Sequence, residues 1–228
     1  MRGETASSFP SPSPIQLVRA GLRWLLALGL ALFGWALVAS ATEAKPLFDG
    51  KSFAGWEGET NQTWRIVDGA FVGGSLSGPV PRNEFLCTTR PYTNFVLRLK
   101  FKLLGEGANA GVQFRTRRIP NDHEVSGYQA DLGDPEWWGC LYDESRRNRV
   151  LAKADAAAVS RVLKRGDWNE YTIRCEGPRI QLWINGLPTV DYIETDAGIE
   201  GSGLIGLQIH GGPPSEAWYK DIRLEELP

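Results

Sequence analysis

The fold is decided by three stretches: NAGVQFRT at residues 109–116, GYQADLG at residues 127–133 and WWGCLYDE at residues 137–144. Each stretch alternates between apolar and polar side chains, with Val112 and Leu132 among the apolar ones. Successive side chains of a β-strand leave on opposite faces, so the apolar positions predict a core and the polar positions predict one shared surface.

The polar positions hold amides, carboxylates, a guanidinium and a phenol. Residues 203–212 alternate in the same way, with Ile205, Leu207 and Ile209 on the apolar face. Neighbouring strands would therefore gather one polar set, which comprises Asn109, Gln113, Arg115, Gln129, Asp131, Tyr142, Glu144, Gln208 and His210. We interpret this set as a wall that suits a hydroxyl-rich ligand.

The rest of the chain reads as short strands and turns. Asp68-Gly69 and Asn185-Gly186 each separate two apolar runs, which predicts two hairpins. Residues 95–102 alternate as a half-buried antiparallel strand, and the Ala-rich residues 154–159 predict one helical turn. Many short strands with almost no helical periodicity predict an all-β sandwich of two sheets, of the jelly-roll kind.

The N-terminal residues have the pattern of a secretory signal. Arg2, Arg19 and Arg23 precede an apolar run from Trp24 to Val38, and Ala39-Ser40-Ala41 supplies small residues for cleavage. The run is shorter than the roughly 20 residues of a spanning helix. We predict a signal peptide at 1–41, a single domain at 42–228, no stable membrane insertion after cleavage, and a secreted or periplasmic protein. An uncleaved anchor is the alternative.

Charge and cysteine content narrow the class further. The chain of 228 residues has a formal net charge of −2, and the predicted signal removes three arginines and one glutamate. A mildly acidic product predicts no nucleic-acid partner. The three cysteines, Cys87, Cys140 and Cys175, allow at most one internal disulfide, and no Cys-x-x-Cys pair indicates a metal site. Cys175 alternates with apolar residues and is interpreted as a core thiol.

Asp131, Glu144 and His210 are the candidate acid and base groups of the wall. A Glu-x-Asp-x-x-Glu strand, frequent in retaining glycosidases, is missing, which disfavours two-carboxylate hydrolysis. His210 exchanges protons near neutral pH, and Arg115 can stabilise an oxyanion. The structural alternatives are a packed histidine and an ordinary surface salt bridge between Arg115 and a carboxylate.

Aromatic and amide side chains complete the predicted binding set. Trp137 and Trp138 are adjacent on a loop, and Trp138 is our candidate for stacking on a sugar, against the equal alternative that the loop packs onto the domain. The amides Gln113, Gln129 and Gln208 can orient hydroxyls.

An ordered series of motifs resembles the 3-keto-disaccharide hydrolase family over residues 46–227. The matching residues are LFDG at 47–50 with Trp56, AGVQFR at 110–115, GYQAD at 127–131, LYDE at 141–144, WNEY at 168–171, NG at 185–186, GLQIH at 206–210 and IR at 222–223. The resemblance implies a concanavalin A-like lectin/glucanase sandwich with its ligand on the concave sheet.

The resemblance also implies cleavage of glycosides already oxidised at C3. In that chemistry a base removes the C2 proton, the C1 aglycone leaves, and water adds to the 2-hydroxy-glycal. By position, His210 or Glu144 would be the base and Arg115 the enolate stabiliser, while Gln113, Gln129, Asp131 and Gln208 would contact sugar. The resemblance leaves open a divalent ion at Asp131, Glu144 and His210, and no cofactor is firmly predicted.

Three hypotheses compete at this stage. The leading one is an exported 3-keto-glycoside lyase and hydratase acting on a small sugar substrate, with a partner oxidase supplying the keto sugar. The second is a carbohydrate-binding β-sandwich module without turnover, since hydrogen bonds and stacked tryptophans suffice for binding. The third is a plain structural or adhesive domain.

Overall fold

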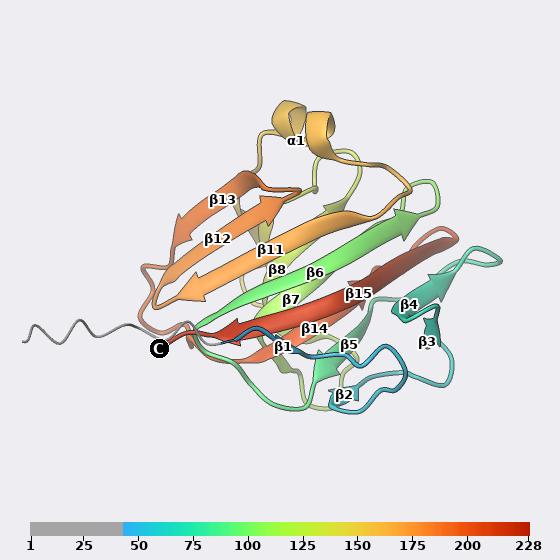
Figure 1. Cartoon of the computed structure of the whole chain (residues 1–228), viewed down its shortest axis with the longest axis horizontal. Helices are drawn as coiled ribbons and strands as arrows, with labels where there is room; N and C mark the ends of the chain where they lie inside the picture. The colour runs from blue at the N-terminus through green and yellow to red at the C-terminus, as the bar shows by residue number, and fades with distance from the viewer. Residues whose placement is uncertain (1–42) are drawn as a thin grey trace, which may run out of the picture. The chain divides into compact units, whose positions relative to one another are not determined.

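The computed structural model describes residues 43–228, which lie in the second of the two units, Met1–Ser40 and Ala41–Pro228, into which the chain divides. The predicted signal peptide at 1–41 lies outside the described residues. Two antiparallel sheets pack face to face, as the layered strands of Figure 1 show. This arrangement confirms the predicted all-β sandwich.

One sheet has eight strands. Its order is β13 (Leu187–Ile193), β12 (Arg179–Ile184), β11 (Asn169–Glu176), β6 (Phe95–Leu104), β15 (Ser215–Glu226), β4 (Ala70–Ser75) and β3 (Trp64–Val67), with β1 (Lys45–Pro46) pairing along β15. Asn185 and Gly186 both have positive φ, which is the geometry of the tight hairpin turn that their sequence predicts.

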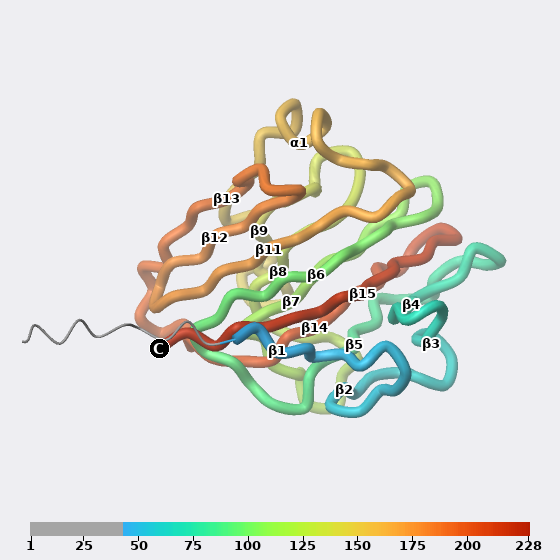
Figure 2. Tube along the Cα trace, in the orientation of Figure 1, coloured from blue at the N-terminus to red at the C-terminus, as the bar shows by residue number. Residues whose placement is uncertain are grey.

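The second sheet has seven strands. Its order is β10 (Arg149–Ala152), β9 (Leu141–Glu144), β8 (Val125–Gly133), β7 (Asn109–Arg118), β14 (Leu204–Ile209), β5 (Glu84–Thr88) and β2 (Trp56–Glu57). The three stretches that decide the fold thus form neighbouring strands, with β14 beside β7. The trace in Figure 2 shows this sheet lying behind the eight-stranded one. Within residues 43–228 the one helix, α1 (Ala156–Val162), is longer than the predicted turn and begins after its cap, Asp155.

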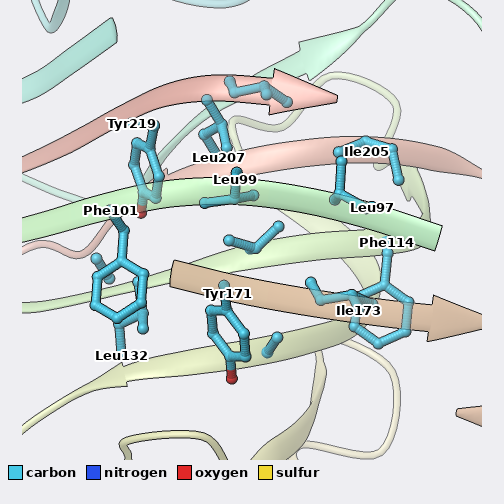
Figure 3. Close-up of a cluster of buried hydrophobic side chains, with 14 of the residues drawn as sticks. Leu97, Leu99, Phe101, Phe114, Leu132, Tyr171, Ile173, Ile205, Leu207 and Tyr219 are labelled. Carbon is cyan, nitrogen blue, oxygen red and sulfur yellow. The ribbon is translucent and has the colours of Figure 1, made fainter. Parts of the chain in front are cut away.

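The core fills the space between the sheets. Alternate side chains of β6, β11 and β15 meet those of β7, β8 and β14, and Figure 3 shows the central ones: Leu97, Leu99, Phe101, Phe114, Leu132, Tyr171, Ile173, Ile205, Leu207 and Tyr219. All are buried, and each apolar side chain of this kind contributes about 1.5–3 kcal/mol by leaving water.

Tyr219 links the two sheets through its hydroxyl. Its ring packs in the core, and its hydroxyl donates toward two carbonyl oxygens of the seven-stranded sheet, Gly111 O at 3.1 Å and Gln208 O at 2.7 Å. The backbone of β7 and β14 is therefore fixed from the core side, directly below the polar face.

The three cysteines, Cys87, Cys140 and Cys175, are all free and buried. The single disulfide that the sequence allowed is not formed, and Cys175 is the core thiol that its alternation predicts. Burial raises the pKa of both Cys87 and Cys175 to about 12, so these thiols stay protonated.

Candidate active site

A polar pocket lies on the face of the seven-stranded sheet that is turned away from the core. It is open, has a volume of about 140 Å³, and is lined by Asn109, Gln129, Asp131, Trp137, Tyr142, Glu144 and His210. These residues come from β7, β8, β9, the loop between β8 and β9, and the end of β14. The pocket brings together six of the residues that the sequence placed on one polar surface: Asn109, Gln129, Asp131, Tyr142, Glu144 and His210.

Asp131 is the more deeply buried of the two acids that line the pocket. It is 2% exposed, and burial raises the pKa of its carboxyl to about 8, with the Glu144 charge adding to the effect. Gln129 Nε2 donates to Asp131 Oδ1 at 2.5 Å, whereas Oδ2 is buried and has no hydrogen-bond partner in the described part of the chain. The second oxygen is therefore left to accept a proton or a hydrogen bond from a ligand.

Glu144 lies beside it at the end of β9. Burial raises the pKa of its carboxyl to about 7, and the nearby charge of Glu124 raises it further. Gln208 Nε2 donates to Glu144 Oε2 at 3.4 Å, a long hydrogen bond. Two carboxyl groups with pKa values near neutrality in one pocket are the pattern that general acid–base chemistry uses.

His210 follows β14 and is exposed at the pocket edge. Its Nδ1 lies 2.6 Å from the carbonyl oxygen of Gly211, which can only accept, so Nδ1 carries the hydrogen. Nε2 is then the ring nitrogen left for a ligand in the pocket.

Two of the predicted sugar contacts lie under the pocket instead of lining it. Gln113 and Gln208 are on the predicted face but are 0% exposed. Gln113 donates to Gln129, and Gln208 donates to Glu144 while its own Oε1 is buried without a partner among residues 43–228. These two amides therefore hold the residues above them and are not placed to contact a ligand directly.

The placement of Arg115 on the polar face is wrong. A β-bulge shifts the register of β7 and β8 between Phe114 and Arg117, and Arg115 itself has a φ of 46°. Its side chain is consequently turned to the end of the sandwich, where it donates to Thr93 O at 2.8 Å and Gly177 O at 2.8 Å. Arg115 is a buried brace between the sheets and does not line this pocket, so it is not positioned to contact a ligand bound there.

The choice between the two loop tryptophans is also reversed. Trp138 packs on Phe101 of the core, and its indole donates to Asp134 at 2.8 Å. Trp137 lines the pocket and meets Tyr142 edge to face, with 6.2 Å between ring centres. Trp138 thus follows the packing alternative, and Trp137 is the aromatic residue positioned for a ligand.

Sequence reasoning missed a second contributor from a loop. Glu124, just before β8, accepts from Asn83 at 3.1 Å and acts on Glu144 through its charge. Strand alternation gave no signal for it because the residue precedes the strand.

The suggested divalent ion has no assembled ligand set here. Within residues 43–228 no group of three or more His, Cys, Asp or Glu side chains is arranged to hold a metal ion. Asp131, Glu144 and His210 share a pocket without converging on one point.

Fold and pocket together define a lectin- and glucanase-like sandwich with a polar site on one sheet. The chain belongs to the 3-keto-alpha-glucoside-1,2-lyase-like domain family, whose model matches residues 43–225. This membership supports a carbohydrate-related function. No curated protein matches the sequence at a significant level. No helix in the described residues is long and apolar enough to cross a membrane.

Several solved structures share this fold at low sequence identity, and three of them are named as sugar-acting or sugar-binding proteins. A provisional glycosyl hydrolase from Parabacteroides distasonis has a TM-score of 0.62 at 19% identity, over 81% of this chain and 94% of that one. The carbohydrate-binding module CBM66 of Bacillus subtilis has a TM-score of 0.59 at 15% identity, over 75% and 96%. The β-glucanase of Bacillus licheniformis has a TM-score of 0.55 at 11% identity, over 83% and 100%. These likenesses confirm the concanavalin-like sandwich.

Proposed function

We propose that the chain cleaves 3-keto-glycosides by removing the C2 proton and eliminating the C1 aglycone. The observation that carries this proposal is the pair of buried carboxyls, Asp131 and Glu144, whose pKa values of about 8 and about 7 suit proton transfer near neutral pH. The family match supplies the reaction class.

The pocket's unpartnered acceptor favours a polyhydroxyl ligand. Asp131 Oδ2 is a buried acceptor of the pocket without a donor in the described structure. Leaving a buried acceptor unmet costs about 1–3 kcal/mol, so a ligand that brings hydroxyl donors would be stabilised. The keto oxygen only accepts hydrogen bonds, and Asn109 and Tyr142 of the pocket lining offer donors to it.

The reaction needs two groups of the pocket in turn. A base takes the C2 proton, the electron pair moves toward the 3-keto oxygen as an enolate, and the C1–O bond then breaks. The departing alkoxide takes a proton from an acid such as protonated Glu144 or His210. Water next adds across the C1=C2 bond, its hydroxyl to C1 and its proton to C2, so that the net result is hydrolysis. Asn109 and Tyr142 replace Arg115 as the enolate's donors.

A binding module without turnover is the second candidate. The edge-to-face pair of Trp137 and Tyr142 gives an aromatic wall of the kind that sugars stack on, and CBM66 shares the fold. In this case the carboxyls would only accept hydrogen bonds from hydroxyls, and their raised pKa values would be a by-product of burial.

Turnover of a chromogenic 3-keto-glucoside, measured beside the unoxidised glucoside with and without chelator, separates these candidates. Cleavage of the keto form alone supports elimination. Cleavage of both forms favours hydrolysis by Asp131 and Glu144, and a loss with chelator would indicate a metal. No cleavage, with retained sugar affinity in His210→Ala, favours the binding module.

We also propose export of the protein. The pattern of residues 1–41 supports a cleaved signal and a secreted or periplasmic location. A 3-keto substrate requires an oxidation at C3, so a partner oxidase would act before this enzyme. Mass spectrometry of the protein recovered from its native host tests cleavage after Ala41.

A further inference from the structure

A chain of three hydrogen bonds runs beneath the pocket and ends on Asp131. Thr116 Oγ1 donates to Gln113 Oε1 at 3.4 Å, Gln113 Nε2 donates to Gln129 Oε1 at 2.5 Å, and Gln129 Nε2 donates to Asp131 Oδ1 at 2.5 Å. All four residues are at most 3% exposed. At this burial the side chains themselves set the direction of the bonds.

The charge of ionised Asp131 fixes the direction of all three hydrogen bonds. An ionised Asp131 can only accept, so Gln129 must turn its Nε2 toward it and its Oε1 toward Gln113. Gln113 must then present Nε2 to Gln129 and Oε1 to Thr116, whose hydroxyl is the donor that starts the series. Each amide dipole points the same way and stabilises the anion at the end.

The strand register and one glycine make this arrangement fit. Gln113 of β7 lies opposite Gln129 of β8, and Gly111 lies opposite Asp131. A Cβ on Gly111 would lie 2.6 Å from Cγ and Cδ of Gln129, so glycine is needed for that side chain to reach across to Asp131. The bulge that removes Arg115 from this face puts Thr116 there in its place.

We propose that Thr116, Gln113 and Gln129 are positioning residues, which saturate Asp131 Oδ1 and hold Oδ2 as the base for the C2 proton. This inference rests on the proposed function and refines the sequence-based choice of His210 or Glu144. In the step, Asp131 Oδ2 gains the proton, the C2–H electron pair enters the enolate, and Glu144 gives a proton to the departing alkoxide.

Other titratable groups face Asp131 from the elements packed around it. They are Glu144 and Tyr142 of β9, Cys140 before β9, Tyr171 of β11 and His210 after β14. None of them donates a hydrogen bond to either carboxylate oxygen of Asp131 in the described structure, since Tyr171 donates to its backbone oxygen instead. The direct donor to the carboxylate is Gln129.

The test uses variants that touch neither substrate nor Asp131. Thr116→Val removes the first donor at nearly constant volume, and Thr116→Ser keeps it. Gln113→Leu removes the middle amide and so interrupts the series of hydrogen bonds. Weaker donation raises the Asp131 pKa, so the acid limb of the kcat/KM profile should move to higher pH by roughly half to one unit in Thr116→Val and Gln113→Leu. At pH 7, kcat should fall about 3- to 10-fold with KM unchanged, since only the base is affected.

Thr116→Ser should keep the wild-type profile, and circular dichroism should show that all three variants fold. An unmoved acid limb in Gln113→Leu would overturn the inference. So would a KM increase without a change of profile, because it would make the amides substrate contacts.

A second readout separates this inference from the proposed function. The carboxyl infrared band that disappears in Asp131→Asn reports the titration of Asp131 without any substrate. Suppose that the wild type turns over no 3-keto-glycoside but the band titrates at a different pH in Gln113→Leu. The positioning of Asp131 by these residues is then supported, and the proposed reaction is overturned. If the band titrates at the same pH in both proteins, the positioning role is overturned, whatever the turnover.

Discussion

The two sheets show the same alternation of apolar and polar residues, but the polar residues on their outer faces have opposite environments. On the eight-stranded sheet the outward residues are charged and solvated, as in the pairs Lys100–Asp221 at 2.9 Å and Arg98–Glu225 at 3.6 Å. On the seven-stranded sheet they are buried amides and carboxyls that bond to one another. Surface pairs contribute little to stability, whereas buried polar groups are tolerated only when they are bonded or serve a ligand.

The comparison shows where to look for function in a sandwich of this kind. Asp131 Oδ2 and Gln208 Oε1 are unmet acceptors on the outer face of the seven-stranded sheet, and the pocket lies above them. Changes on the two faces should therefore differ in kind: one face should affect turnover and pH dependence, the other almost nothing.

The largest effect is expected from neutralising the base. Asp131→Asn should lower kcat by about 10²- to 10⁴-fold with little change of KM, because proton transfer is lost while the shape is kept. The matched carboxylate on the other face, Glu170 of β11, should tolerate Glu170→Gln within twofold. Steady-state kinetics on a 3-keto-glucoside measures both, and equal losses would remove the distinction between the faces.

The second effect is on stability as a function of pH. The pKa values of Asp131 and Glu144 are raised to about 8 and about 7, from about 4 in an unfolded chain. Their favourable contribution to the free energy of unfolding is fully present below about pH 4 and is lost as the pH rises through 7 and 8.

Urea titrations between pH 5 and 8.5 should show this decline in wild type. The double variant Asp131→Asn, Glu144→Gln should have a flatter profile, and Glu170→Gln should keep the wild-type slope. If the free energy of unfolding depended on pH in the same way in all three proteins, the pKa values of the pocket carboxyls would not be raised by folding.

A third comparison sets the buried arginine against an exposed one. Arg115→Ala leaves the carbonyls of Thr93 and Gly177 without their donor and should lower the free energy of unfolding by about 2–4 kcal/mol. Arg98→Ala should change it by less than about 0.5 kcal/mol. Thermal unfolding measures both, and kcat of folded Arg115→Ala should stay within a few-fold of wild type. A specific collapse of kcat would return Arg115 to the reaction.

The smallest effect separates the two tryptophans. Trp137→Ala should raise KM about tenfold, equivalent to about 1.4 kcal/mol of lost binding, with unchanged thermal stability. Trp138→Ala should lower stability by about 2–3 kcal/mol through lost packing on Phe101 and leave KM near wild type. The reverse pattern would restore the assignment made from sequence.

Strand periodicity was enough to predict most of the fold and part of the site. Gln129, Asp131, Tyr142 and Glu144 lie where alternation places them, because regular strands carry that information locally. The predicted position of Arg115 was wrong because nothing in the sequence signals that this arginine has a positive φ within a β-bulge. Gln113 was on the correct face, yet depth below the surface depends on the neighbouring side chains. Loop residues such as Trp137 and Glu124 are oriented by tertiary packing, which no period describes.

The hydroxyl of Tyr219 has a consequence for the timescales of the molecule. It ties the carbonyls of Gly111 and Gln208 to the core, so the amides of β7 and β14 should exchange with deuterium only in the slowest class, through global opening. We therefore expect the backbone under the pocket to open only when the whole domain unfolds. Adaptation to sugars of different size falls to the rim, where Trp137 is on a loop and His210 follows the last residue of β14.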